Sequence, residues 1–252
     1  MTLNIISFNI RCVGDPDGNS IPERAPRLQK VISIYGADII GFQEFRPAWE
    51  PYITEYYSDQ YDMFNKYRSS TTDIESSPIL WRKDKFDCIK TGYFWLSDTP
   101  EVESKGWDEK YNCYRMCAYV ILRKKSTGMQ FTFMNTHFGF GDKGQVDSAN
   151  LIHCYSQKIS DLPTCIVGDF NMVPDSPGYA AMTKHFTDVN TATVNDMRTT
   201  YHGYHPEKIS NAHIDFCFIN SAITPVTQKI IDEQVDGKFP SDHYGLYIEV
   251  KL

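Results

Sequence analysis

The stretch Cys165-Ile166-Val167-Gly168-Asp169-Phe170-Asn171 places three apolar residues before a glycine, a carboxylate and a carboxamide. The apolar run predicts a strand buried on both faces, and Gly168 is expected to let the backbone turn at its end. Alternate residues of an extended segment point to the same side, so Asp169 and Asn171 are expected to face one reaction centre. Taken alone, the stretch is more typical of an ordinary strand-to-loop turn, where Asp and Asn are common for backbone reasons.

The bulk composition indicates a folded protein with a substantial core. The chain has 252 residues, of which 41% are hydrophobic and 23% charged, and its aromatic residues favour a β-rich fold. The net charge of −7 argues against a protein that grips long duplex nucleic acid, because such binding needs a clustered positive surface. A short or terminal phosphodiester neutralised by a metal ion is still compatible with that charge.

The cysteine pattern and the lack of a signal-peptide pattern favour a cytoplasmic protein. The seven cysteines are an odd number, and the pair Cys113 and Cys117 lacks the second pair or histidine cluster that a zinc site needs. Reduced, mostly buried thiols are therefore expected. Met1 leads directly into a strand pattern without the features of a signal peptide, and no apolar run reaches membrane-spanning length. We expect no membrane association and no obligate protein partner.

The hydrophobic pattern along the chain predicts strands that alternate with fewer helices, which is most economically one domain over residues 1–252. The expected strands cover residues 3–10, 38–45, 62–67, 78–81, 86–96, 116–123, 130–136, 213–219 and 246–250. The expected helices cover residues 27–35, 49–57 and 148–159, with another after Pro177, and loops are expected over 14–26 and 97–112.

Polar residues recur where the apolar strands end. Ligands and catalytic groups gather at such places because the strands hold them rigidly. Each residue also has a plain alternative: Glu44 suits a helix N-terminus, His137 suits a satisfied, partly buried position, and Asp242-His243 suits a turn. The joint placement weakens these alternatives. The set comprises Asn9, Glu44, Asn135-Thr136-His137, Asp169, Asn171, Asp215 and Ser241-Asp242-His243.

In this order, the motifs resemble those of the endonuclease/exonuclease/phosphatase superfamily, and the similarity runs nearly end to end. The motifs are Phe8-Asn9, Gln43-Glu44, Asn135-Thr136-His137, Gly168-Asp169-Phe170-Asn171, Ile214-Asp215-Phe216 and Ser241-Asp242-His243. The segments 93–100, Gly106-Trp107-Asp108 with Arg115, and 200–204 are similar to bacterial proteins near the deadenylase and nocturnin branch. The resemblance implies a four-layer α/β sandwich, with two mixed β-sheets packed face to face and helices outside, and metal-dependent phosphoester hydrolysis.

The same resemblance implies a role for each site residue. Glu44 is expected to be the main ligand of Mg²⁺ or Mn²⁺, with Asp242 and Asn9 contributing directly or through water.

The remaining roles concern the water and the phosphate. Asp169 is expected to position or deprotonate the attacking water, and Asn171 to orient it or hold a phosphate oxygen. Asp215 is expected to hydrogen-bond His243 and favour its charged form. His137 is expected to bind a phosphoryl oxygen or assist the leaving group, and Arg115 is a candidate phosphate contact. The choice of general base between Asp169 and His243 is left open.

The run Phe138-Gly139-Phe140-Gly141-Asp142-Lys143-Gly144-Gln145 departs from nuclease-like relatives, which often carry an Asp or His and a basic residue here. Its glycines are expected to make a mobile loop at the cleft rim. Phe138 or Phe140 is a candidate to stack on a base or ring, and the departure makes a nucleic-acid substrate less certain than hydrolysis itself.

Two substrate classes remain close after this reasoning. The first is RNA or short nucleic acid, hydrolysed by a 3′-5′ exonuclease or phosphodiesterase. The second is a small soluble phosphate ester such as an inositol phosphate. A binding module without catalysis would predict missing acidic ligands, whereas all the expected ones are present.

Overall fold

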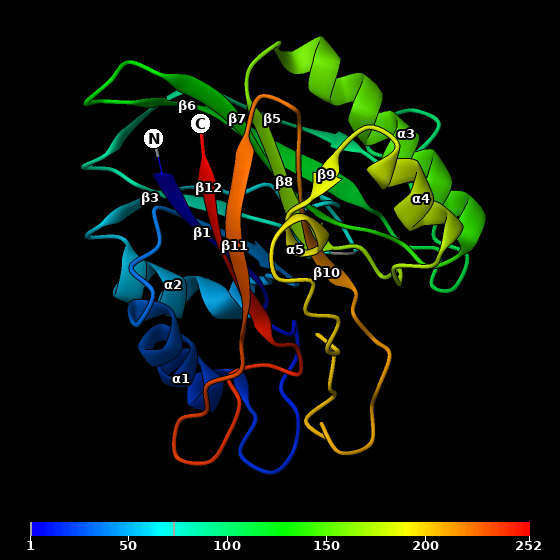
Figure 1. Ribbon diagram of the computed structural model, residues 1–252. Coiled ribbons are helices and arrows are strands. Elements are labelled where there is room, and N and C mark those ends of the chain that lie inside the picture. The colour runs from blue at the N-terminus through cyan, green and yellow to red at the C-terminus, as the bar shows by residue number, and fades with distance from the viewer. Residues whose placement is uncertain (1, 73) are drawn as a thin grey trace.

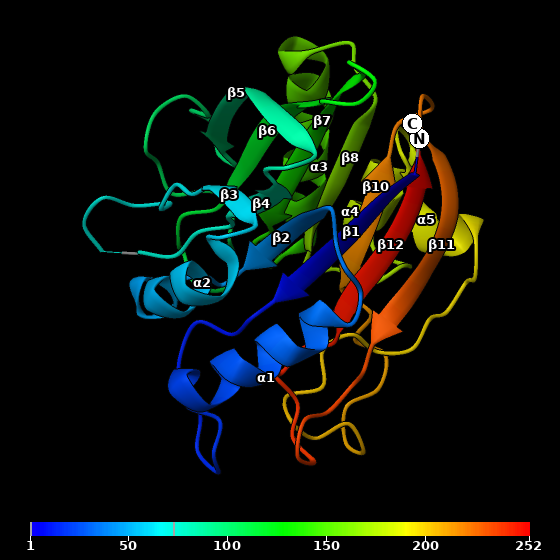
Figure 2. The same cartoon turned by 90° about the vertical axis from the view of Figure 1, so that its left-hand side faces the viewer.

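The computed structural model describes residues 2–72 and 74–252. It contains two six-stranded mixed β-sheets packed face to face, with helices on both outer faces (Figures 1 and 2). The predicted four-layer α/β sandwich is therefore confirmed. The first sheet has the order β11 (Thr224–Ile231), β12 (Gly245–Lys251), β1 (Thr2–Asn9), β2 (Ile39–Gln43), β4 (Ile79–Arg82) and β3 (Tyr61–Phe64). The second has the order β5 (Phe86–Trp95), β6 (Met116–Lys124), β7 (Gln130–His137), β8 (Thr164–Asp169), β10 (Asp215–Ile219) and β9 (Thr187–Asp188).

Three hydrophobic layers hold these four layers together. Both faces of strand β8 are apolar because both are covered. Cys165 and Val167 pack between the two sheets, whereas Ile166 packs under the outer helices α3 (Asp142–Ile159) and α4 (Pro177–Thr183). On the other side, α1 (Ile21–Ser33) and α2 (Glu50–Tyr57) cover the first sheet through Leu28 and other buried residues. Strands enclosed in this way lose contact with water on both faces, which is the main stabilising contribution.

The sheet topology brings six strand ends to one end of the sandwich, opposite the two chain termini (Figure 1). The strands β1 and β2 run parallel, as do β7 and β8, so their carboxyl ends lie together. The strands β12 and β10 run antiparallel to β1 and β8, so their first residues reach the same end. In this register His137 and Asp215 both lie opposite Asp169.

Helix α1 begins six residues earlier than expected, inside the segment predicted to be a loop. Pro22 is compatible with the first turn, where backbone N–H groups lack partners in any helix, and the Glu23 carboxylate accepts a hydrogen bond from Ser20 N at 3.1 Å. Ile21 and Ala25 are buried against the sheet, and this burial outweighs the helix-breaking tendency of Pro26. Proline spacing alone therefore misplaced the helix start.

Other differences concern short or weakly patterned elements. Helix α3 starts at Asp142, six residues before the predicted start. The edge strands β11 and β9 and the short helices α5 (Val189–Ala192) and η1 (Pro47–Trp49) were not predicted. Edge strands contact only one neighbour and carry a weak pattern; the exposed residues of β11 alternate with partly buried ones. Among the described residues, no helix combines the length and apolar character needed to cross a bilayer.

Candidate active site

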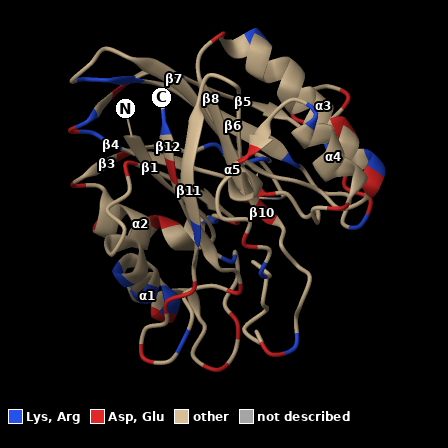
Figure 3. Cartoon of the chain, in the orientation of Figure 1, with Lys and Arg blue, Asp and Glu red and all other residues tan. Residues whose placement is uncertain are grey.

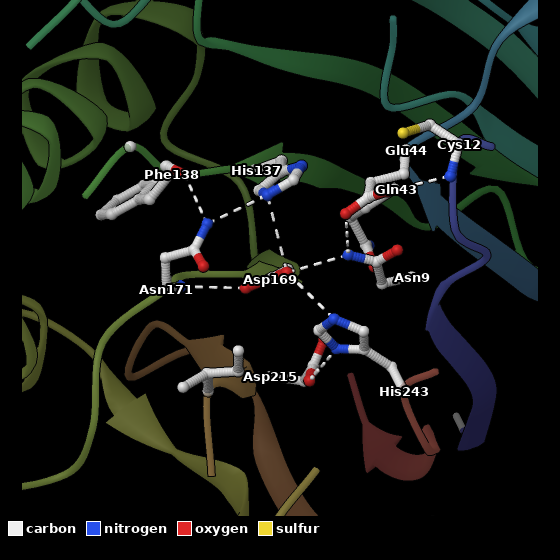
Figure 4. Close-up of polar contacts among 12 residues, drawn as sticks. Asn9, Cys12, Gln43, Glu44, His137, Phe138, Asp169, Asn171, Asp215 and His243 are labelled. Carbon is white, nitrogen blue, oxygen red and sulfur yellow. Dashed lines mark hydrogen bonds and ion pairs between the residues drawn. The ribbon is translucent and has the colours of Figure 1, made fainter. Parts of the chain in front are cut away.

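The Asp169 carboxylate lies at the centre of the polar cluster at the strand ends (Figure 4). Its Oδ2 atom accepts a hydrogen bond from Asn9 Nδ2 at 2.9 Å. The same oxygen lies 3.6 Å from His137 Nε2 and 3.7 Å from His243 Nε2. Residues from β1, β7, β8 and the turn before β12 thus converge on one carboxylate oxygen that is shielded from solvent.

Each of the two histidines has a buried carboxylate beside its other ring nitrogen, but only His243 makes a hydrogen bond there. His243 Nδ1 lies 3.0 Å from Asp215 Oδ2, as expected from the sequence. His137 Nδ1 lies 3.3 Å from Glu75 Oε1, and Glu75 also pairs with Arg68 Nη1 at 2.7 Å. Sequence reasoning missed Glu75 and Arg68 because their irregular, polar segment between β3 and β4 carries no strand-end signal.

Glu44 follows β2 directly and adopts a left-handed backbone conformation, with φ of 59°. This conformation is uncommon for a residue other than glycine and concentrates at functional sites. Glu44 Oε1 accepts from Asn9 Nδ2 at 3.1 Å, and Oε2 accepts from Cys12 N at 2.9 Å. Asn9 therefore donates to both Glu44 and Asp169, while its own oxygen accepts from Arg11 N at 3.0 Å.

Asn171 reaches the same centre by a different route from the expected one. The extended strand ends at Asp169, and Asn171 has a φ of 49°. Its backbone N–H donates to Asp169 Oδ1 at 2.9 Å, and its Nδ2 atom lies 3.0 Å from His137 Nε2. The shared orientation therefore comes from a side-chain-supported turn and not from strand alternation.

Gly168 does not provide the turn that was expected of it. It lies within β8, and a Cβ atom at this position would come within 2.3 Å of Thr136 O on β7. The glycine is needed for the close approach of these two strands, which places His137 beside Asp169.

Asp242 lies beside this cluster, in the turn before β12. It is buried, and its Oδ2 atom lies 3.6 Å from Arg11 Nε. The turn is tied to β1, because Ser241 Oγ donates to Asn9 O at 2.6 Å.

Burial and charge act in opposite directions on these groups. Burial raises the pKa of Asp169 and of Asp242 above the ordinary carboxylate range. Burial would also raise the pKa of Glu44, but the nearby His137 and the hydrogen bonds from Cys12 bring it well below its ordinary value. Burial lowers the pKa of His243, but the carboxylates of Asp215, Asp169 and Asp242 raise it. The net pKa is about 10. The cluster thus holds a proton on His243 and a negative charge on Glu44.

The cluster opens into a cavity of about 690 Å³. Of the predicted residues, Glu44, His137, Asp169, Asn171, Asp242 and His243 line it together with Arg115. Asn9 and Asp215 support these residues from behind. Arg115 directly precedes β6, and its guanidinium pairs with Asp108 at 3.0 Å.

The two phenylalanines of the glycine-rich segment after β7 take different positions. Phe138 is fully buried and packs on Phe170, with ring centroids 4.7 Å apart. It therefore cannot stack on a substrate, whereas Phe140 does line the cavity. Glycine at position 139 permits close packing, because a Cβ there would lie 2.9 Å from Asp108 Cα.

Asn135, from the predicted polar triplet, links the two sheets behind the site. Its Nδ2 atom donates to Phe42 O at 2.8 Å and to Pro78 O at 2.9 Å, and its Oδ1 atom accepts from Gln43 Nε2 at 2.8 Å. All three partners belong to the first sheet or its edges. The residue is fully buried, so it supports the site without facing the cavity.

The donor set fits a hard divalent cation. Glu44, His137 and Asp169 offer ligand atoms that lie within 4.8 Å of one another, and Asp169, Asp215 and His243 form a second such group. Carboxylate oxygens dominate both groups, as Mg²⁺ and Mn²⁺ prefer. In this arrangement Asn9 turns its N–H₂ group, not its oxygen, toward the carboxylates. Its role as a metal ligand stays a prediction.

Solved structures similar to this chain share its fold over nearly the full length. A family member from Bacteroides thetaiotaomicron is 27% identical, with a TM-score of 0.92 and coverage of 99% of this chain and 97% of that one. A mannosyl-6-phosphatase from the same species is 28% identical, with a TM-score of 0.90 and coverage of 99% and 100%. The human Nocturnin catalytic domain is 14% identical, with a TM-score of 0.76 and coverage of 99% and 93%, which shows the fold alone. No curated protein sequence matches the chain.

A family model supports the same assignment from sequence. The model of the Endonuclease/Exonuclease/phosphatase family matches residues 6–243. This range includes each strand-end motif from Asn9 to His243. The chain therefore belongs to the Endonuclease/Exonuclease/phosphatase family.

Proposed function

We propose that the chain is a divalent-metal-dependent hydrolase of a small soluble phosphate monoester, with sugar phosphates as the leading substrate class. The observation that carries the substrate class is the 28% identity, over nearly the full length of both chains, to a mannosyl-6-phosphatase. Zebrafish TDP2, solved in complex with a single-stranded DNA product, is only 17% identical. We therefore rank a small phosphate ester above RNA or short nucleic acid as the substrate class.

Charge distribution supports the same choice. The chain has a net charge of −7, and acidic and basic side chains are interspersed on α1 and α3 (Figure 3). Long duplex binding requires a continuous positive surface. A metal ion and the cavity arginines can instead neutralise one phosphate group locally.

In the proposed reaction, a Mg²⁺ or Mn²⁺ ion held by Glu44 and Asp242 would withdraw charge from the phosphate and stabilise the leaving oxygen. Asn9 would hold the Glu44 and Asp169 carboxylates in place through its amide group. Water attacks phosphorus, the bond from phosphorus to the ester oxygen breaks, and the products are an alcohol and inorganic phosphate.

The remaining residues manage protons and phosphoryl oxygens. Asp169 is suited to accept the proton of the attacking water, because burial raises its pKa toward the working range. His243, held charged by Asp215, can donate a hydrogen bond to a phosphoryl oxygen. His137, beside Glu75, instead accepts at Nε2 from the Asn171 amide group and so fixes the Asn171 side chain. This arrangement favours Asp169 over His243 as the general base. Asn171 and Arg115 complete the proposed contacts with the phosphate.

A second candidate is exonuclease action on a single-stranded end. Tyr111 and Phe140 support it, because both line the cavity and their ring centroids lie 5.4 Å apart. Aromatic rings that line a cavity can stack on bases.

The cytoplasmic location and the single-domain organisation stay predictions.

The deciding experiment measures phosphate release from mannose 6-phosphate, glucose 6-phosphate and an inositol phosphate, and shortening of a single-stranded RNA. Each reaction is run with Mg²⁺, Mn²⁺ or EDTA. We expect metal-dependent release from a sugar phosphate and no turnover by Glu44→Gln. Shortening of RNA from its 3′ end without phosphate release from the small esters would move the assignment to the exonuclease. Undiminished turnover in EDTA or by Glu44→Gln would contradict the metal site.

A further inference from the structure

The cavity wall formed by residues 105–115 is organised by one carboxylate, Asp108. We call residues 105–115 the wall segment. Asp108 Oδ1 accepts from Lys110 N at 3.0 Å and Tyr111 N at 2.8 Å. Asp108 Oδ2 accepts from Arg115 Nε at 3.0 Å and Cys113 Sγ at 3.3 Å. The carboxylate therefore satisfies a turn at one oxygen and holds an arginine at the other.

Arg115 makes its contacts with Asp108 through only part of its guanidinium. Nε and Nη2 both lie 3.0 Å from Asp108 Oδ2. The side chain is 5% exposed, and that of Asp108 is fully shielded. Nη1 is also buried, and among the described residues it has no hydrogen-bond partner. A buried donor without a partner is costly, and Arg115 lines the cavity, so an acceptor on a bound ligand would satisfy Nη1.

The wall segment is also fitted tightly against the strand that carries His137. Glu109 N donates to Phe140 O at 2.9 Å. A Cβ at Gly139, two residues after His137, would lie 2.8 Å from Asp108 Cβ. Arg115 itself precedes β6, whose Cys117 pairs with Thr136 on β7. Asp108 thus fixes Arg115 relative to the strand end that carries His137.

We propose that Asp108 is a positioning residue that directs Arg115 Nη1 toward a non-bridging oxygen of the substrate phosphate. This inference rests on the proposed function, and it assigns the Gly106-Trp107-Asp108 motif a role in substrate affinity. A planar guanidinium can hold a carboxylate on one edge and a phosphate on the other. Lysine has three donors on one nitrogen and no planar fork, so it cannot present two separate edges in fixed directions. Asp108 touches neither the reacting atoms nor the metal ligands, so its effect is transmitted through Arg115.

The test compares Asp108→Asn, Arg115→Ala and the double variant in their affinity for orthophosphate with Mg²⁺ present. Affinity is measured by phosphate-dependent thermal stabilisation and, where turnover is found, by product inhibition and KM. We expect Arg115→Ala to weaken phosphate binding about 10- to 100-fold, as for a lost charged hydrogen bond. Asp108→Asn should reach a large part of that loss with a smaller change in kcat. In the Arg115→Ala background, Asp108→Asn should add no more than about twofold.

A matched control uses another Arg–Asp pair that involves the same strand. Arg123 Nη2 on β6 and Asp87 Oδ2 on β5 lie 2.9 Å apart, are exposed, and do not line the cavity. Asp87→Asn and Arg123→Ala should leave phosphate affinity unchanged. Full additivity of Asp108→Asn and Arg115→Ala, or unchanged affinity in folded Asp108→Asn, would overturn the positioning role.

Arg115→Lys keeps the inference testable if Asp108→Asn fails to fold. It should lose most of the phosphate affinity, and retention within about twofold of the native value would contradict the two-edged use of the guanidinium. Orthophosphate binding requires no turnover. Arg115-dependent binding by a protein that hydrolyses none of the esters would refute the proposed function alone. Hydrolysis with phosphate affinity independent of Asp108 would refute the positioning role alone.

Discussion

The strand-end cluster and the wall segment face the same cavity but are built in different ways. Asp169, His137 and Glu44 extend from or directly follow strands of the two sheets, and their positions follow from strand register. The wall segment has no helix or strand of its own, and its turn at residues 108–111 and the position of Arg115 rely on hydrogen bonds to the Asp108 carboxylate. The contrast suggests that rigid strand ends serve the reaction, whereas the wall segment can vary to select the substrate.

The largest expected effect is a fall in kcat on changing the strand-end cluster, whereas changing the wall segment should mainly raise KM. Asp169→Asn should lower kcat about 10³- to 10⁴-fold, because the variant keeps the size of the side chain but loses the proton acceptor. Its KM should change little, unlike that of Arg115→Ala. Steady-state kinetics on the best sugar phosphate measures both parameters. A fall of less than about tenfold in kcat would remove Asp169 from the reaction.

The two histidine supports should differ in weight. Asp215→Asn should reduce kcat about 100-fold, because Asp215 both orients His243 and favours its charged form. Glu75→Gln should cost about tenfold, because Glu75 lies farther from its histidine and is shared with Arg68. Both are measured under saturating substrate, with metal affinity as a parallel measurement. The reverse order would mean that the support of His137 matters more for turnover than the support of His243.

Hydrogen bonds behind the strand-end cluster should contribute strongly to the free energy of unfolding. Asn135→Ala removes the three hydrogen bonds between the sheets and leaves Phe42 O and Pro78 O without this partner. We expect a loss of about 3 kcal/mol in the free energy of unfolding. Urea denaturation measures it, with Asn150→Ala on the exposed face of α3 as the control. Equal stability of the two variants would mean that the sheets need no polar link here.

A smaller effect depends on pH. Burial lowers the pKa of His202, which lies beside the Asp242 turn, to about 4. An unfolded histidine has a pKa near 6.5, so the folded state binds fewer protons and stability falls as pH drops from about 6.5 toward 4. We expect a loss of about 1 to 3 kcal/mol over this range.

His202→Gln should flatten this pH dependence in urea denaturation at pH 7 and pH 5. The exposed His205→Gln serves as the control on the same loop. An unchanged slope in His202→Gln would place the acid sensitivity elsewhere.

The parts of the fold that sequence could predict are those with strong local patterns. The run Cys165 to Val167 identified a strand buried on both faces, and the order of polar motifs indicated the sandwich. The start of α1 was misplaced because proline spacing is local, whereas burial of Ile21 and Ala25 depends on the sheet. The Phe138 side chain was misassigned for the same reason, since exposed and core aromatics look alike in sequence.

The sequence by itself determined which residues stand at the strand ends, since strand limits and polar residues are both local properties. Only the tertiary structure decided which of them meet. Glu75 joined His137, Asp108 was found to hold Arg115, and Asn135 was found to link the sheets. No local sequence pattern around these residues indicates which partner each of them will contact. They form because an unpaired polar group is costly to bury, so the folded structure pairs these groups with one another.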